Sequence, residues 1–212
     1  MIISHSNQFI WIKTRKAASS SIEVGLNWIC NKKDYINWLK ENKKAQEGLK
    51  LTKKSELRKY GISPHTDITT LKEKAINQKL ITPEEWDSYF KFTIERNPWD
   101  KVISYYYYRF ANKSFHVTFQ KFMNDWNWDI CYNWPLYTEN DEIKVDYIMK
   151  FENIKEEMEF ISEKIGKNIE LLNENRFRPK EEKDYRQFYN QKNKKKIEKV
   201  FKKEIDYFNY KF

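Results

Sequence analysis

The chain has 212 residues and a formal net charge of +9; 40% of its residues are hydrophobic and 33% are charged. This length fits one domain with a substantial core, and the apolar content excludes wholesale disorder. No run approaches the roughly 18 apolar residues of a membrane-spanning helix, and the N-terminus has no apolar core of signal-peptide length. We therefore expect a cytoplasmic protein without a membrane partner.

Cysteines, histidines and charge narrow the function classes further. Cys30 and Cys131 are too few for a disulfide framework, and the three histidines show no metal-ligand spacing, so no metal is expected. A basic surface attracts anions such as nucleic acid, acidic polysaccharide or a multiply charged nucleotide. Codon bias toward lysine would also produce the positive charge, so charge alone selects no partner.

The first predicted elements are a strand, a short loop and a helix. The apolar-aromatic run of residues 8–14 (QFIWIKT) predicts the strand, and a basic loop follows it. Ser19, Ser20 and Ser21 then precede an apolar periodic stretch, as is typical of a helix N-terminus. Residues 31–60 are polar and lysine-rich, and we expect an insertion there within a single domain over residues 1–212.

Two helices and a second strand are predicted next. The first helix begins after residue 66 or 67 and ends at Asn77, and the second begins after Thr82, where proline and glutamate follow a capping residue. The alternation of apolar and polar side chains over Tyr89–Glu95 predicts the strand. The sequence Arg96-Asn97-Pro98 then leads into a helix that ends at Phe110.

A third strand is predicted over residues 145–151, a helix over 153–166, and a last helix that begins at residue 190 or 191. Repeated strand–helix units predict an α/β fold, with a P-loop-like three-layer arrangement of a central parallel sheet flanked by helices.

Two of the predicted strands end in basic residues that lead into helices. Lys16 precedes the three serines, and Arg96 precedes the helix that carries Ser104. Ligands of parallel sheets bind beyond the carboxyl ends of the strands, and helix N-termini favour anions. Two such strand ends suit a ligand with two phosphate-like groups. Plain helix caps, or a pair between Arg96 and Glu95 or another carboxylate, would explain either stretch alone.

The two stretches together resemble the cofactor motifs of sulfotransferases that use 3′-phosphoadenosine 5′-phosphosulfate (PAPS), in particular bacterial, viral and carbohydrate-type members. Residues 9–23 (FIWIKTRKAASSSIE) resemble the 5′-phosphosulfate loop, and residues 92–105 (FTIERNPWDKVISY) resemble the 3′-phosphate motif. Residues 149–154 (MKFENI) are similar to a later strand of the family, and residues 184–212 to its C-terminal segment. The resemblance is weakest over residues 31–60.

The resemblance implies an enzyme that moves the sulfuryl group of PAPS to a hydroxyl acceptor, with PAP as the product. Lys16 would stabilise the leaving phosphate, and Arg96 with Ser104 would hold the 3′-phosphate. His65, ahead of a predicted helix, is the candidate base, with Glu152 as a second candidate. The implied cofactor-binding residues are Arg15, Lys16, Ala17, Ala18, Ser19, Ser20, Ser21, Arg96 and Ser104.

The implied acceptor is a carbohydrate, and no specific nucleic acid is expected. A late basic loop with Arg176, Arg178 and Lys180 could close over the cofactor. The family's 5′-phosphosulfate loop is rich in glycine, whereas this loop contains Ala17 and Ala18. Alanine disfavours positive φ, so a left-handed residue at either position would be strained.

Two other functions would each explain some features of the sequence. A small-molecule kinase of the P-loop type would share the strand–loop–helix design, but the Walker pattern is absent and no glycine precedes Gly25. A basic, non-enzymatic nucleic-acid-binding protein would explain the charge and the aromatic residues. It would not explain two motifs at two strand ends with matching spacing.

Overall fold

The structure is a computed structural model that describes residues 1–36, 55–110, 117–171 and 184–212. The contacts divide the chain into two compact units. The sheet unit comprises Met1–Thr14, Ala18–Glu95 and Pro135–Glu174, and the helical unit comprises Arg15–Ala17, Arg96–Trp134 and Asn175–Phe212. Each unit is described by itself below.

The core of the sheet unit is a six-stranded mixed sheet with the strand order β4-β3-β1-β2-β5-β8. The strands are β1 (Ile2–Ser4), β2 (Phe9–Trp11), β3 (Tyr35–Ile36), β4 (Ser55–Glu56), β5 (Phe90–Glu95) and β8 (Tyr147–Lys150). Strands β2, β5 and β8 are parallel neighbours, whereas β1 is antiparallel to both β2 and β3. The four residues between β1 and β2 are too few for a parallel crossover, so this pair forms a hairpin.

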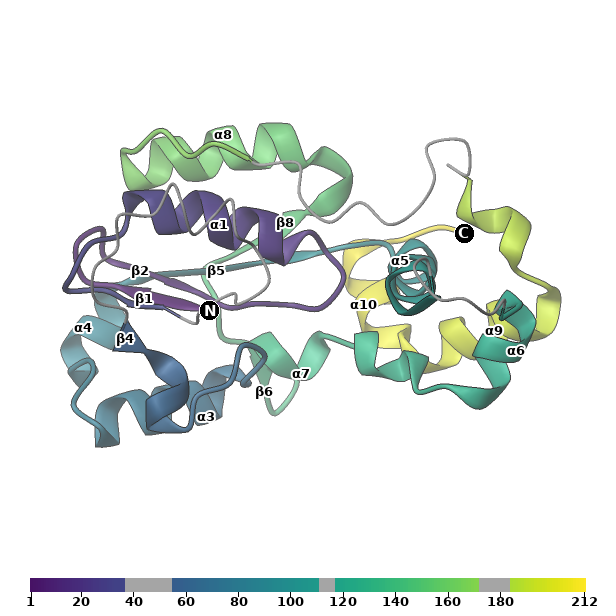
Figure 1. Cartoon of the computed structure of the whole chain (residues 1–212), viewed down its shortest axis with the longest axis horizontal. Coiled ribbons are helices and arrows are strands. Elements are labelled where there is room, and N and C mark those ends of the chain that lie inside the picture. Colours follow the sequence, from purple (N-terminus) through teal and green to yellow (C-terminus); the bar gives the residue numbers. More distant parts are fainter. Residues whose placement is uncertain (37–54, 111–116, 172–183) are drawn as a thin grey trace. The chain divides into compact units, whose positions relative to one another are not determined.

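Helices cover both faces of this sheet (Figure 1). Helices α1 and α8 lie on one face, and α3 and α4 lie on the other. Their bounds are α1 (Ser19–Ile29), α3 (Ile68–Asn77), α4 (Pro83–Ser88) and α8 (Ile154–Ile165). The unit also has the 3-10 helices η1 (Leu57–Tyr60) and η3 (Phe151–Asn153) and the short ribbon β6 (Thr138–Glu139) and β7 (Glu142–Ile143). The predicted α/β class with helices flanking a central sheet is confirmed, and the sheet is mixed rather than wholly parallel.

Local capping chemistry places the helices of the sheet unit. The side chain of Asp67 accepts a hydrogen bond from the Thr70 N–H at 2.8 Å, and α3 begins at the next residue. Thr82 and Glu85 form the predicted capping box of α4. Gly166 adopts the left-handed conformation that ends α8, at φ 71°. Each of these boundaries follows from residues that are adjacent in the sequence.

The helical unit contains α5 (Pro98–Phe110), α6 (Phe119–Asp125), η2 (Trp128–Cys131), η4 (Tyr185–Phe188), α9 (Gln191–Val200) and α10 (Lys202–Phe208). Its core is aromatic: the ring of Tyr106 contacts those of Phe119 and Phe122 with centroids 5.5 and 5.4 Å apart. One predicted helix is divided in two, because the buried Phe201 leaves the helical conformation at φ −97° and ψ 20°. The short helix α7 (Trp134–Tyr137) begins at Trp134, the last residue of the Arg96–Trp134 segment of the helical unit.

The predicted insertion at residues 31–60 lies partly outside the described residues, and its described parts form β3, β4 and η1. Within the described ranges, no helix is long and apolar enough to span a membrane.

Candidate functional site

The loop between β2 and α1 contains two residues in the left-handed conformation. Lys16 has φ 60° and Ala18 has φ 59°, although neither is glycine. Ala18 is also the N-cap of α1 and supplies no side-chain hydrogen bond to the helix. The N–H groups of Ser19 and Ser20 precede the first hydrogen bond of α1, which the Ser21 N–H donates to the Ala18 carbonyl oxygen. N–H groups without a helical partner are the usual basis of anion binding at a helix N-terminus. The strain expected for a left-handed alanine is therefore present at Ala18.

Ala18→Gly is expected to raise the free energy of unfolding by about 1 kcal/mol, because glycine adopts positive φ without a Cβ clash. Ala17 is the matched control, since it is fully buried and lies outside the left-handed region. Ala17→Gly should lower the free energy of unfolding by about 1 kcal/mol through lost burial and added chain entropy. Urea unfolding measures both changes, and a loss of stability in both variants would contradict the assigned strain at Ala18.

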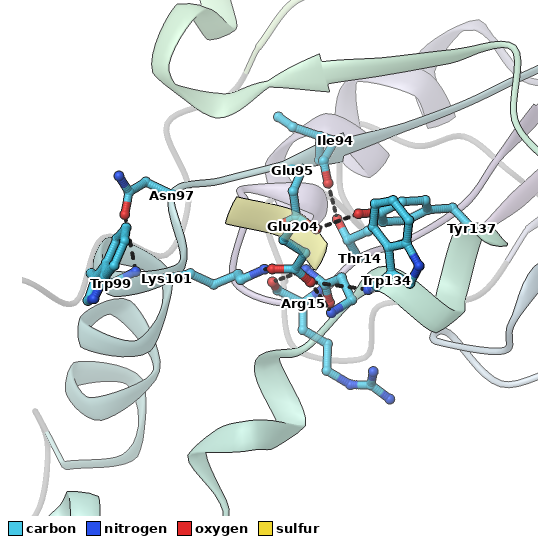
Figure 2. Close-up of polar contacts among 11 residues, drawn as sticks. Thr14, Arg15, Ile94, Glu95, Asn97, Trp99, Lys101, Trp134, Tyr137 and Glu204 are labelled. Atoms are coloured by element: carbon cyan, nitrogen blue, oxygen red, sulfur yellow. Dashed lines mark hydrogen bonds and ion pairs between the residues drawn. The ribbon is translucent and has the colours of Figure 1, made fainter. Parts of the chain in front are cut away.

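In the sheet unit, Ser19 closes the ends of this loop. Its buried hydroxyl donates to the Thr14 carbonyl oxygen at 2.7 Å. The Thr14 hydroxyl donates in turn to the Ile94 carbonyl oxygen at 2.6 Å, at the end of β5 (Figure 2). The hydroxyl of Ser19 thus holds the two ends of the loop together. The sequence pattern alone did not distinguish this structural role from a contact with phosphate. Ser20 is half-buried, and the buried Ser21 donates its N–H to the Ala18 carbonyl oxygen at 2.9 Å.

His65 lies beside the strand that enters the loop. Its Nδ1 is 2.9 Å from the carbonyl oxygen of Lys13. A carbonyl can only accept, so Nδ1 must carry the proton in this hydrogen bond. In the neutral ring Nε2 is then the basic nitrogen, which is the state that a general base needs. The half-buried side chain of His65 is held in one tautomer by a residue of the sheet unit.

Two lysines near the end of β2 have different partners. The buried ammonium of Lys13 forms an ion pair with Glu23, whose side chain is fully buried. The ammonium of Lys16 instead lies over the ring of Tyr108, 4.1 Å from the ring centroid. Lys13 is therefore paired with a carboxylate of the sheet unit, whereas the ammonium of Lys16 lies against an aromatic face in the helical unit.

In the helical unit, Arg96 is held by a carboxylate and contacts the loop backbone. Its Nε and Nη2 donate to Oδ2 of Asp100 at 2.8 and 2.6 Å, and its Nη1 donates to the carbonyl oxygen of Lys16 at 3.3 Å. Asp100, one helical turn along, is thus a carboxylate partner of Arg96. An arginine held in this way presents a fixed guanidinium edge to the loop.

Asp100, Ser104 and Tyr108 form a line along α5 that we call the α5 stripe. Their spacing of four residues places them on one face of the helix. Lys16 contacts Tyr108 at one end of the stripe through its ammonium, and its carbonyl oxygen accepts from Arg96, which Asp100 holds at the other end. The half-buried Ser104 lies between these contacts on the same face. Three residues predicted separately, Lys16, Arg96 and Ser104, are therefore gathered in one unit.

The electrostatic surroundings of Lys16 disfavour its positive charge. The pKa of Lys16 is lowered to about 8, mainly by burial; Cys131 partly offsets this shift, and nearby Arg96 adds to it. An anion bound beside Lys16 would favour its charged form and offset the cost of burial.

A buried polar network fixes the backbone of Arg15 (Figure 2). The Arg15 N–H donates to Oδ1 of Asn133 at 2.8 Å, and Nδ2 of Asn133 donates back to the Arg15 carbonyl oxygen at 3.1 Å. The N–H of Asn133 donates to Oε1 of Glu204 at 2.6 Å, and Oε2 of Glu204 accepts from Lys101 at 2.6 Å. Asn133, Lys101 and Glu204 are fully buried. No local pattern in the sequence indicates this network, because its members lie far apart along the chain.

The remaining predicted residues have varied positions. Asn97 binds within the helical unit: its Oδ1 accepts from the Trp99 N–H at 3.1 Å, and its Nδ2 donates to the Lys211 carbonyl oxygen at 3.0 Å. Glu152 is exposed on η3. The basic loop with Arg176, Arg178 and Lys180 lies outside the described residues. Among the described residues, no group of His, Cys, Asp and Glu side chains is arranged to hold a metal ion.

Comparison with known proteins gives two findings. A family model described as "Sulfotransferase family" matches residues 1–211. An uncharacterized protein of Archaeoglobus fulgidus is 40% identical to the chain over 91 residues, which cover 41% of this chain and 75% of that protein. The family match includes both predicted motifs and every described element of the two units.

Proposed function

The chain belongs to the sulfotransferase family, and we propose that it takes the sulfuryl group from PAPS and transfers it to a carbohydrate hydroxyl, releasing PAP. Membership of the family supports sulfuryl transfer to a hydroxyl-bearing acceptor. The observation that supports PAPS as the donor is the contact of Lys16 with Arg96 and with Tyr108 of α5, the helix that also carries Ser104. We also propose that residues 1–212 act as one catalytic domain and need no metal.

Arg96 and Ser104 are proposed to bind the 3′-phosphate of PAPS. The Asp100 carboxylate holds Nε and Nη2 of Arg96, which leaves the Nη1 side of the guanidinium directed toward the loop. Arginine is suited to phosphate because its planar donors form charge-assisted hydrogen bonds in fixed directions. The 3′-phosphate is absent from ATP, so this contact would select PAPS over the common adenine nucleotides.

The loop is proposed to bind the 5′-phosphosulfate. The N–H groups at the start of α1 and the hydroxyl of Ser20 would donate to its oxygens. The Arg15, Ala17 and Ala18 backbones would line the approach, and Ser19 would keep the loop closed through its bond to Thr14. The left-handed conformation at Ala18 turns the chain from the loop into the helix.

The transfer itself moves one group and one proton. A bond forms between the acceptor oxygen and sulfur, and the bond between sulfur and the bridging oxygen of PAPS breaks. The acceptor proton goes to Nε2 of His65, and the negative charge left on the 5′-phosphate of PAP is stabilised by the ammonium of Lys16. The hydrogen bond from His65 Nδ1 to Lys13 supports this role, because it keeps Nε2 free of a proton in the neutral ring.

Calorimetric titration with PAP tests the proposal, with ATP and ADP as comparison ligands. We expect PAP to bind and ATP to bind far more weakly. Arg96→Ala should weaken PAP binding by about 2–4 kcal/mol, because it leaves a phosphate without its charged partner. Arg109→Ala is the matched control, since it removes the same charge from an exposed position of α5. Absence of PAP binding by the wild type, or wild-type affinity in Arg96→Ala, would overturn the assignment.

A further inference from the structure

The half-buried Lys16 contacts an aromatic ring of α5. The Lys16 ammonium is 4.1 Å from the Tyr108 ring centroid, and the Tyr105 ring stacks with that of Tyr108 at 6.4 Å and 24°. Buried Lys13 and Lys101 instead form ion pairs with the fully buried carboxylates of Glu23 and Glu204. Lys101 also lies 5.1 Å from the centroid of the Phe201 ring, but Glu204 balances its charge, and the ammonium of Lys16 lies closer to its ring.

An aromatic ring beside Lys16 affects the binding of an anion differently from a carboxylate. A carboxylate beside Lys16 would cancel its charge and would repel an incoming phosphosulfate. The face of an aromatic ring attracts an ammonium through its quadrupole but carries no net charge, so it leaves the ammonium available to an anion. Tyr108 is 46% exposed, so it is not enclosed in the core of the helical unit.

We propose that Tyr108 is a positioning residue for Lys16, and that its ring holds the ammonium charged and oriented for the phosphosulfate. This inference rests on the proposed function for its catalytic consequence, but the contact itself can be tested without a cofactor. The phenol hydroxyl is not needed for it, so phenylalanine should replace tyrosine, whereas an aliphatic side chain should not.

The groups that surround Lys16 determine whether its pKa should rise or fall when Tyr108 is replaced. Cys131, from η2, partly favours the ammonium, and Arg96, two residues before α5, disfavours it. Asp100 is engaged by Arg96, and Tyr105 stacks on Tyr108 from the same helix. Burial lowers the pKa of Lys16 to about 8, so removal of the ring's attraction should lower it further.

Competitive labelling with acetic anhydride, followed by mass spectrometry of the peptide that contains Lys16, measures this titration directly because only the neutral amine reacts. We expect a midpoint near pH 8 in the wild type and in Tyr108→Phe. Tyr108→Leu keeps an apolar side chain and should lower the midpoint by roughly 0.5–1.5 pH units. Tyr207→Leu, at an exposed tyrosine of α10, is the control for loss of an aromatic ring.

Turnover provides the second measurement, with release of PAP from PAPS and water as the acceptor. Tyr108→Leu should lower kcat/KM by about 3- to 30-fold, and Tyr108→Phe should restore most of the loss. An unchanged labelling midpoint in Tyr108→Leu, or equal effects of leucine and phenylalanine, would overturn the role of Tyr108. A lowered midpoint in a protein that does not bind PAP would instead uphold the contact and overturn the proposed function.

Discussion

His65→Ala is expected to lower the rate of sulfuryl transfer by about 10²–10⁴-fold, because the acceptor hydroxyl loses the base that takes its proton. The affinity for PAP should stay close to that of the wild type, since His65 is proposed to act on the acceptor rather than on the nucleotide. Steady-state turnover and calorimetric titration with PAP separate these two effects.

His65→Asn is the matched variant for the structural role of the histidine. The side-chain amide of asparagine can donate to the Lys13 carbonyl oxygen as Nδ1 does in the wild type, but it offers no basic nitrogen. The loss of turnover should therefore be as large as in the alanine variant, while the stability should be closer to that of the wild type. Wild-type turnover in His65→Asn would remove His65 from the mechanism.

Glu204→Ala should lower the free energy of unfolding by about 3–5 kcal/mol. The substitution leaves the fully buried ammonium of Lys101 without its carboxylate, and it leaves the N–H groups of Asn133 and Trp134 without their acceptor (Figure 2). Urea unfolding measures the loss, and PAP titration should show weaker binding because Asn133 fixes the backbone of Arg15.

A double variant separates the cost of an unpaired charge from the value of the pair. Lys101→Met combined with Glu204→Gln removes both charges and keeps an acceptor for the two N–H groups. Its stability should return toward that of the wild type, because a buried ion pair and a well-packed neutral pair often differ little. A double variant as unstable as Glu204→Ala would show that the charges themselves are required.

Local sequence signals predicted the elements whose boundaries depend on neighbouring residues. The capping box at Thr82 and the cap at Asp67 gave the starts of α4 and α3, and alternation gave β5. The antiparallel strand β1 and the two-residue strands β3 and β4 were missed, because such short strands are stabilised by pairing with distant partners rather than by their own pattern. The mixed character of the sheet follows from β1.

The sequence likewise predicted some residues of the candidate site and missed others. The motifs gave Lys16, Arg96 and Ser104, and these gather in the helical unit. Asp100 could have been found as the partner of Arg96, because a spacing of four residues places a carboxylate within reach on a helix. Tyr108 carried no such signal, since its neighbours in the run of tyrosines at 105–108 look alike in sequence and only the fold selects one of them.

The left-handed alanine at position 18 has a consequence for the evolution of the protein. Every alanine codon becomes a glycine codon through a single change at its second base, so relief of this strain is one point mutation away. A library selected for heat resistance should therefore recover Ala18→Gly early and repeatedly. The PAP affinity of the recovered variants should then be compared with that of the wild type. A lower affinity in the glycine variants would show that the alanine, although it lowers thermal stability, limits the conformations of the loop before PAP binds.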